Sequence, residues 1–264
     1  MEQIKPKGSM LPVRAVLLDF DGTISTLRHG WERVMQPLMT EFLGADSGPL
    51  VQRYIDESTG IQTIHQMKWL AAQVKARGGQ ALDPWDYKAE YNCRLMLEVE
   101  EKRRGILNGQ VHPDRYLIGG AKEFLAAMRA LGVALHVASG TDHPDVVREA
   151  ELLGVAGLVD SIAGAPVGEE SCSKEQVLRR LAQEKGLRGG EVCVIGDGKV
   201  EIALGAELGA RTIGLATDEE HRQGVNPHKR DKLIRAGAEA IAGDFLDLPA
   251  MMAWMNLGGE HSGL

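Results

Sequence analysis

Short runs of apolar residues, most of them followed by a helical stretch, organise much of the chain. The runs are Ala15–Leu18, Ala134–Ala138, Val192–Ile195 and, more weakly, Arg211–Leu215. Runs that are apolar at every position are typical of central strands in a parallel sheet, which are buried on both faces. Helical stretches lie between them, at Ala121–Leu131, Pro144–Leu153, Ser173–Lys185 and Val200–Leu208. The alternation predicts an α/β fold with a Rossmann-like parallel-sheet core and helices on both faces.

The interval between Leu27 and Asp114 has a different pattern. It is nearly free of strand signals and rich in helix formers, with glycine- and proline-containing breakers between the pieces. Its helical stretches are Trp31–Phe42, Val51–Tyr54, Ile61–Arg77 and Pro84–Arg104. A wholly helical insertion after the first strand predicts a second domain above the sheet. We therefore expect a core domain of residues 12–27 and 114–250 and an α-helical cap domain of residues 28–113.

Composition and charge narrow the class of partner. Of the 264 residues, 44% are hydrophobic and 25% are charged, which is ordinary for a folded domain. The formal net charge of −7 argues against nucleic acid and anionic membranes as partners, because both attract basic faces. A small anionic metabolite stays compatible, since a metal ion and a few local donors can reverse the charge of one pocket.

The cysteines and the N-terminal region favour a cytoplasmic protein. Cys93, Cys172 and Cys193 are widely spaced and form no C-x-x-C pair, so we expect two buried apolar side chains and one on a helix. Residues 1 to about 11 are polar, carry no secretory signal and are expected to form a loose tail. No segment approaches the roughly 20 apolar residues that a membrane helix needs.

Two acidic residues follow the first apolar run, in the motif Asp19-Phe20-Asp21-Gly22-Thr23. Ligands of an open parallel sheet bind beyond the carboxyl ends of its strands. Gly22 allows the backbone to turn there, so that both carboxylates can face one crevice. One carboxylate beside a divalent cation can attack phosphorus, and a second can protonate the leaving oxygen. Taken alone, the motif is also compatible with a solvated acidic turn.

Two further groups suit a phosphoryl ligand. Ser139-Gly140-Thr141 follows the second apolar run and offers a hydroxyl and backbone N–H groups to phosphoryl oxygens, although such a segment is often only a turn. Lys174, near the start of a helix, can neutralise a nucleophile and a transferred phosphoryl group. Lys185 and Lys199 are rivals of the same type, and any of the three can instead be a solvated helix lysine.

A second acidic cluster lies in Gly196-Asp197-Gly198-Lys199-Val200-Glu201. Asp197 follows a strand and begins a helix, where its carboxylate can complete an oxygen shell for Mg²⁺. Glu201 lies one helical turn further on and on the same face, so it can reach the same ion directly or through water. An acidic first turn that complements the helix dipole is the alternative, and it explains one acidic residue better than two.

In this order, the motifs resemble those of the haloacid dehalogenase superfamily, in its phosphoglycolate phosphatase-like branch with an α-helical cap after the first motif. The resemblance covers Val13 to about Leu248. It implies a Mg²⁺-dependent phosphatase that hydrolyses a small phosphorylated metabolite through an aspartyl-phosphate intermediate. A cap of this kind is compatible with a monomer or a small homo-oligomer.

The resemblance also implies the role of each motif residue. Asp19 would be the nucleophile and Asp21 the general acid/base, while Ser139, Gly140 and Thr23 would hold the substrate and Lys174 would be the counter-ion. Asp19, the main-chain carbonyl of Asp21, and Asp197 would bind Mg²⁺, with Glu201 as a ligand or as a residue that orients a ligand water. The sequence departs from the family pattern at two points. Glu201 stands where Asp is more usual, and Lys174 is not part of the Lys-Pro pair that is common in relatives.

Candidates for substrate selection lie near the hinge of the cap and late in the chain. Arg28 and His29 directly follow the first motif, so either can meet a substrate carboxylate or hydroxyl, or both are solvated hinge residues. The polar stretch Thr217–Arg235 is expected to be mostly solvated surface. Its position can still bring Arg222, His228 or Lys229 to the rim of the pocket.

Other reactions on the same scaffold remain open. A β-phosphoglucomutase-like phosphotransferase is the second interpretation, and a phosphonatase would need a Schiff-base lysine such as Lys68, Lys75 or Lys88. Asp21 disfavours a dehalogenase. A non-catalytic binding protein is less favoured, because Asp19, Asp21 and Asp197 are all present. No G-x-G-x-x-G follows the first strand and no P-loop occurs, which argues against a nucleotide-binding dehydrogenase or P-loop protein.

Overall fold

One sheet forms the centre of the molecule. The computed structural model describes residues 1–6, 9, 11–170, 173–184 and 186–258, and within this part seven strands are ordered β1-β7-β6-β5-β2-β3-β4. Neighbouring strands are parallel except β1 and β7, which are antiparallel. The strands are β1 Glu2–Gln3, β2 Ala15–Leu18, β3 Ala134–Asp142, β4 Ser161–Ala165, β5 Val192–Gly196, β6 Arg211–Leu215 and β7 Ala240–Ala242.

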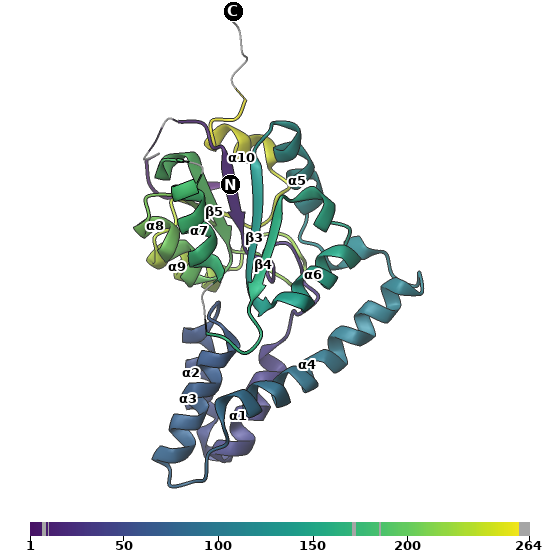
Figure 1. The fold of residues 1–264 in the computed structure, drawn as a ribbon, viewed down its shortest axis with the longest axis vertical. Helices are drawn as coiled ribbons and strands as arrows, with labels where there is room; N and C mark the ends of the chain where they lie inside the picture. The colour runs from purple at the N-terminus through teal and green to yellow at the C-terminus, as the bar shows by residue number, and fades with distance from the viewer. Residues whose placement is uncertain (7–8, 10, 171–172, 185, 259–264) are drawn as a thin grey trace, which may run out of the picture.

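Helices cover both faces of this sheet (Figure 1). On one face, α5 (Ala121–Ala130), α6 (His143–Leu152) and α10 (Leu248–Trp254) pack against Val16 and Leu18. On the other, α7 (Ser173–Glu184) and α8 (Lys199–Glu207) pack against Ala15 and Leu17, and α9 (Pro227–Ala236) packs beside α8. Because successive strand residues point to opposite faces, a strand covered on both sides is apolar throughout.

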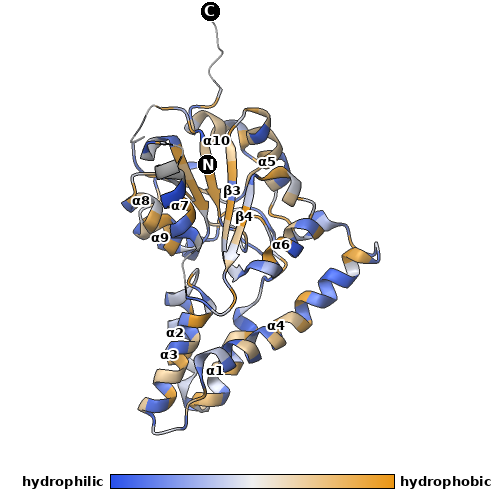
Figure 2. Ribbon diagram, in the orientation of Figure 1, coloured by the Kyte–Doolittle hydropathy of each residue, from blue (hydrophilic) through white to orange (hydrophobic). Residues whose placement is uncertain are grey.

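Four helices form a separate body beneath the sheet, which we call the cap (Figures 1 and 2). They are α1 Glu32–Leu43, α2 Gly48–Ser58, α3 Thr63–Ala76 and α4 Pro84–Leu107. The cap has its own hydrophobic cluster, which includes Met35, Leu38, Leu70 and Tyr87. The chain enters and leaves the cap side by side, since the N–H of Thr26 donates to the Tyr116 carbonyl and the N–H of Ile118 to that of Ile24, at 2.8 and 3.0 Å.

The predicted fold class is confirmed, and most helices and strands lie where the apolar pattern places them. The strand after Ala134 is longer than expected, because it continues through Ser139-Gly140-Thr141 to Asp142, with a break in register against β4. Short 3₁₀ helices, which the pattern did not indicate, occur at Ala45–Ser47, Pro113–Tyr116, Ala156–Leu158 and Gly189–Glu191.

The expectation about the N-terminal segment was wrong, and the one about residues 217–235 was incomplete. The N-terminal segment is not wholly a loose tail, because β1 pairs with β7 and the Arg211 guanidinium donates to the carbonyls of Ser9 and Leu11. The stretch 217–235 is not only solvated surface, since it contains most of α9 and contributes Lys229 to the site described below.

The cysteine prediction can be compared at two of its three positions. Cys93 is exposed on α4 and Cys193 is buried in β5. Cys172 and the candidate Lys185 lie outside the described residues. Within the described part, no helix is both long and apolar enough to cross a membrane.

Candidate active site

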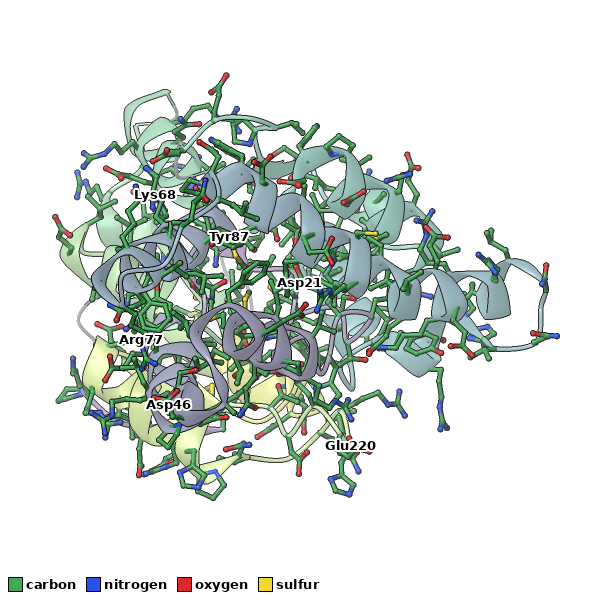
Figure 3. All side chains as sticks on the ribbon, turned by 90° about the horizontal axis from the view of Figure 1, so that it is seen from below. Asp21, Asp46, Lys68, Arg77, Tyr87 and Glu220 are labelled. Carbon is green, nitrogen blue, oxygen red and sulfur yellow. The ribbon has the colours of Figure 1, made fainter. Side chains whose placement is uncertain are left out.

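The polar motifs meet in one cleft between the carboxyl ends of the central strands and the cap. Asp19 follows β2, Ser139 and Gly140 lie in β3, and Asp197 follows β5. The cleft is lined by these residues and by residues of α3 and α4. Figure 3, seen from the cap side, shows Asp21 near the middle of the molecule, behind cap helices. In the sheet, β3 lies on one side of β2 and β5 on the other, so the order of the strands reverses at β2. Ligands of open parallel sheets bind at such a point.

Asp19 is buried, with 7% of its surface exposed. Its Oδ1 accepts from the N–H of Phe20 at 2.8 Å, and its Oδ2 accepts from the Lys174 ammonium at 2.8 Å. Burial raises the pKa of Asp19 well above its ordinary value, and Lys174 opposes this rise. A cation next to Asp19 therefore favours the ionised form that a nucleophile needs.

Gly22 is required by the turn that follows Asp19. Its φ of +72° lies in the left-handed region, and a Cβ built there would be 2.3 Å from Asp197 Oδ2. The turn brings the Asp21 carboxylate back to β3, where Oδ2 accepts from Thr141 Oγ1 at 2.8 Å and from Ser139 Oγ at 3.2 Å. Asp21 Oδ1 is buried and makes no hydrogen bond to the described residues. One oxygen of Asp21 is thus held in place and the other is left for a ligand.

Lys174 joins Asp19 to Glu201. Its buried Nζ lies 2.8 Å from Asp19 Oδ2 and 2.8 Å from Glu201 Oε2, and these carboxylates raise its pKa against the effect of burial. The other Glu201 oxygen accepts from the N–H of Gly198 at 2.6 Å. A Cβ at Gly196 would lie 2.4 Å from Glu201, so the glycine leaves the space that this side chain fills. The rival Lys199 is exposed at the start of α8.

Asp197 is held from two sides. Thr23 Oγ1 accepts from the Asp197 N–H at 3.1 Å, and the Lys229 ammonium donates to Asp197 Oδ2 at 2.7 Å. Burial raises the pKa of Asp197 to about 6, with Lys229 acting in the opposite direction. Lys229 also forms an ion pair with Glu219. Thr23 therefore contacts the acidic cluster, and the contact with substrate that the resemblance implies stays a prediction.

The acidic cluster suits a hard divalent cation. Asp19, Asp197 and Glu201 each offer a carboxylate oxygen, and these atoms lie within 4.8 Å of one another. Burial raises the pKa of both Asp19 and Asp197, so an added positive charge would stabilise their ionised forms. An all-oxygen set is typical of Mg²⁺. The contribution expected from the main-chain carbonyl of Asp21 stays a prediction.

The two hinge residues are engaged by acidic side chains. Arg28 is buried and donates from Nη2 and Nε to the Glu149 carboxylate, at 2.6 and 3.1 Å. Arg28 Nε also lies 3.9 Å from Asp21 Oδ1. The His29 ring contacts Glu219 at 3.2 Å and Glu220 at 3.3 Å.

The cap contributes residues that the sequence patterns did not single out as a group. Lys88 on α4 is buried and donates to Asp142 Oδ1 at 2.6 Å, and Asn92 donates to Asp142 Oδ2 at 3.1 Å. The loop between α2 and α3 also approaches the core, since Gly60 lies against Gly198 and a Cβ at Gly140 would be 3.8 Å from Gln62 Cα. The four-residue spacing of Lys88 and Asn92, about one helical turn, was the one signal in the sequence that places them on one face.

The comparisons with known proteins agree with this geometry. The family model of haloacid dehalogenase-like hydrolases matches residues 13–209. Enolase-phosphatase E1 of Sorangium cellulosum (strain So ce56) is 23% identical over 231 residues, which cover 81% of this chain and 95% of that protein. A predicted phosphoglycolate phosphatase from Haemophilus somnus 129PT superposes with a TM-score of 0.63 at 15% identity, covering 92% of this chain and all of that one.

A β-phosphoglucomutase from Clostridium difficile superposes with a TM-score of 0.58 at 14% identity, over 92% of this chain and 97% of that one. At such low sequence identities, the two superpositions show that the fold is shared and carry no information about the substrate. The family model, in contrast, spans most of the sheet core, the whole cap and the motif residues Asp19, Asp21, Ser139, Lys174 and Asp197. The chain belongs to the haloacid dehalogenase-like hydrolase family.

Proposed function

We propose that this hydrolase is a Mg²⁺-dependent phosphatase that acts on a small phosphorylated metabolite through an aspartyl-phosphate. The observation that carries the proposal is the pairing of a buried carboxylate, Asp19, with the Lys174 ammonium at 2.8 Å, next to a second carboxylate, Asp21, with one oxygen that makes no hydrogen bond to the described residues. A buried carboxylate beside fixed positive charge is suited to attack phosphorus. Residues 28–113 would form the cap domain that excludes water from the reaction.

In the first step, a carboxylate oxygen of Asp19 attacks the phosphorus atom and the bond from phosphorus to the leaving oxygen breaks. Asp21 donates its proton to that leaving oxygen, which departs as an alcohol. Ser139 Oγ and the backbone beside Gly140 hold the phosphoryl oxygens, and Lys174 stabilises their negative charge. Bound at Asp19 and Asp197, Mg²⁺ would supply further positive charge to the transferred group.

In the second step, Asp21 takes a proton from a water molecule whose oxygen forms a bond to phosphorus. The bond between phosphorus and the Asp19 oxygen breaks, which returns the carboxylate and releases inorganic phosphate. The same Asp21 oxygen therefore gives and regains one proton per turnover. Thr141 supports this role because its hydroxyl holds the other oxygen of Asp21 in place, while the single hydroxyl proton of Ser139 turns from that oxygen to the phosphoryl group when substrate binds.

The alternative reactions receive less support. A phosphonatase would need a neutral lysine amine in the cleft. Lys88 is the cap lysine that lines the cleft, and its Nζ is bound to Asp142 at 2.6 Å, a contact that formation of a Schiff base would have to break. Lys68 is paired with Glu170 outside the cleft. A mutase would use the same core residues, and its distinguishing step is transfer of phosphate to a second substrate position rather than to water.

The test is release of inorganic phosphate from p-nitrophenyl phosphate, with Mg²⁺ and with a chelator. We expect turnover with Mg²⁺ only, and we expect Asp19→Asn to abolish it, because an amide cannot form the acyl phosphate. Asp46→Asn is the matched control, since Asp46 pairs with Arg77 on the far side of the cap (Figure 3). Full turnover by Asp19→Asn, or equal turnover with chelator, would show that the proposed mechanism is wrong.

A further inference from the structure

The charges that line the cleft bear on the leaving group of the substrate. Five carboxylates line it, namely Asp19, Asp21, Asp142, Asp197 and Glu219, and three residues with a full positive charge, namely Arg28, Lys88 and Lys174. The difference of two leaves a formal charge of −2 on the wall. A divalent cation at Asp19 and Asp197 would bring this sum to zero, or to +1 once Asp21 carries the proton that it donates in the first step.

Each of these cations already has a carboxylate partner. Arg28 is bound to Glu149 at 2.6 Å, Lys88 to Asp142 at 2.6 Å, and Lys174 to Asp19 and Glu201 at 2.8 Å. His29, which also lines the cleft, lies between Glu219 and Glu220. Within the described part of the chain, every cationic side chain of the cleft is therefore already paired with a carboxylate. A second anionic group of the substrate would have no unpaired cation to bind there. Placing a carboxylate there would require one of these pairs to open.

The remaining lining from the cap is neutral. Asn92, Gln66 and Thr63 carry amide and hydroxyl groups that donate and accept hydrogen bonds, and Trp31 and Tyr91 add aromatic surface. The cleft is open, and the space in it and at its mouth, solvent included, comes to about 900 Å³. Uncharged hydroxyl groups of a substrate can form hydrogen bonds with these side chains without breaking an ion pair.

We infer that the substrate is the phosphomonoester of an uncharged polyol or sugar, and that the site discriminates against phosphorylated carboxylic acids. This inference rests on the proposed phosphatase function and deepens it by naming the substrate class. Asp142 is the residue that sets the discrimination, because it neutralises Lys88 and accepts from Asn92 at the cap side of the cleft. Asp142 acts through these two side chains and is not itself a catalytic residue.

The experiment compares pairs of phosphate esters that differ in one group, CH₂OH against carboxylate. The pairs are sorbitol 6-phosphate with 6-phosphogluconate, glycerol 3-phosphate with 3-phosphoglycerate, and 2-hydroxyethyl phosphate with 2-phosphoglycolate. We expect the neutral member of at least the best-hydrolysed pair to have a kcat/KM about tenfold or more above that of its partner. Titration calorimetry of the best pair with Asp19→Asn should show the same order of affinity, without turnover.

A charge change at Asp142 gives the sharper test. Asp142→Asn removes the partner of Lys88, so the ratio of neutral to carboxylate kcat/KM should fall about tenfold. Glu170→Gln is the control, because it frees Lys68 from an ion pair between cap and core that is exposed and lies outside the cleft. We expect that variant to keep the wild-type ratio.

The outcomes separate this inference from the proposed function. Failure to hydrolyse p-nitrophenyl phosphate with Mg²⁺ would contradict the phosphatase function itself. Hydrolysis of p-nitrophenyl phosphate with no neutral ester preferred over its carboxylate partner would overturn the substrate class alone. A wild-type ratio in Asp142→Asn would overturn the part assigned to Asp142 and Lys88.

Discussion

At the scale of single residues, the two oxygens of the Asp21 carboxylate have different surroundings. Oδ2 is fixed by two hydroxyl groups of β3, and Oδ1 is buried without a hydrogen bond to the described residues. The first arrangement reduces the freedom of the side chain, and the second leaves an acceptor that a substrate can use. The hydroxyl of Thr141 is the closer of the two donors, at 2.8 Å.

Thr141→Val should therefore lower kcat/KM for p-nitrophenyl phosphate about three- to tenfold, which corresponds to the loss of one hydrogen bond of roughly 0.5–1.5 kcal/mol. The shape of the side chain is kept, so the melting temperature should change little. Thr40→Val is the control, because its hydroxyl donates to Gln36 within α1 and lies outside the cleft. Steady-state kinetics of both variants measure the effect, and equal activities would contradict the role given to Thr141.

His29 makes the stability of the hinge depend on pH. Hydrogen bonds from its ring to Glu219 and Glu220, with the nearby charge of Glu32, raise the pKa of His29 above 6.5. His29 and Lys229 lower the pKa of Glu219 to about 2 despite its burial, so Glu219 stays ionised near neutrality. The folded chain thus holds the His29 proton more tightly than the unfolded chain does. The stabilisation is complete below about pH 6.5 and is lost as the pH rises through the folded-state pKa.

His29→Gln should consequently cost more thermal stability at pH 5.5 than at pH 8.5. Melting temperatures of the wild type and the variant across this range measure the difference. The gap should narrow as the pH rises. A gap that is constant or widens with pH would mean that the protonated His29 does not stabilise the hinge.

At the scale of elements, the loop between α2 and α3 brings the cap up to the acidic motif of the core. Gly60 has a φ of +88°, and a Cβ built there would lie 3.1 Å from Gly198 Cα. Gly78, between α3 and α4, has a similar φ of +76° but no neighbouring atom within 4 Å of such a Cβ. The two glycines differ in what surrounds them and share the same backbone requirement.

Gly60→Ala and Gly78→Ala should each destabilise the chain by about 1–2 kcal/mol through the left-handed backbone. Only Gly60→Ala should also reduce kcat/KM, because its methyl group pushes the loop away from Gly198. Thermal unfolding and kinetics of the two variants separate strain from contact. Equal losses of activity in both would contradict a role for the loop in closing the cleft.

The sequence predicted the elements that are long or buried on both faces. Arg211–Leu215 and Ala15–Leu18 form strands with the predicted limits. Missed were β4, whose Ser-Ile-Ala-Gly-Ala sequence has little of the β-branched character of a strand, and β7, which has three residues. Ser139-Gly140-Thr141 was expected to follow the strand, with a simple turn as the alternative to a phosphoryl cradle, but it continues β3 with a change in register.

At the scale of the whole molecule, the hydrophobic cluster of the cap is separate from the clusters that cover the sheet. Leu38 is fully buried in the cap cluster, and Ile195 is fully buried in the cluster of the sheet. Direct polar contacts between cap helices and core include Lys88 with Asp142 and Lys68 with Glu170. A cap held by such pairs and by two adjacent connections can loosen while the sheet stays folded.

Leu38→Ala should destabilise the cap by about 2–5 kcal/mol through the cavity it leaves. Hydrogen exchange should then speed up in residues 32–107 while Val192–Gly196 keeps its protection. Leu97→Ala is the control, since that leucine is 72% exposed on α4. Uniform loss of protection in both regions would show that cap and core unfold as one unit.

The site was predictable where each residue follows a strand, and less so where distant elements meet. Asp19, Asp21 and Asp197 could be placed together because parallel strands end at one edge. Lys229 reaches Asp197 only because α9 lies beside α8, and the pairing of Lys88 with Asp142 depends on how α4 crosses the core. The residues of the first pair are 32 positions apart in the sequence and those of the second pair 54. No local sequence pattern encodes contacts over such separations.

The paired connections between cap and core have a consequence for protein engineering. Residues 24–26 and 116–118 run side by side, joined by two backbone hydrogen bonds of 2.8 and 3.0 Å and by a bridge between Ser25 and Leu117. The cut ends that remain after removal of the helices therefore lie within reach of a tight turn. Joining them would give a chain without the cap, in which the proposed active site at the carboxyl ends of the strands is open to solvent. Phosphate groups on a partner as large as another protein could then reach that site.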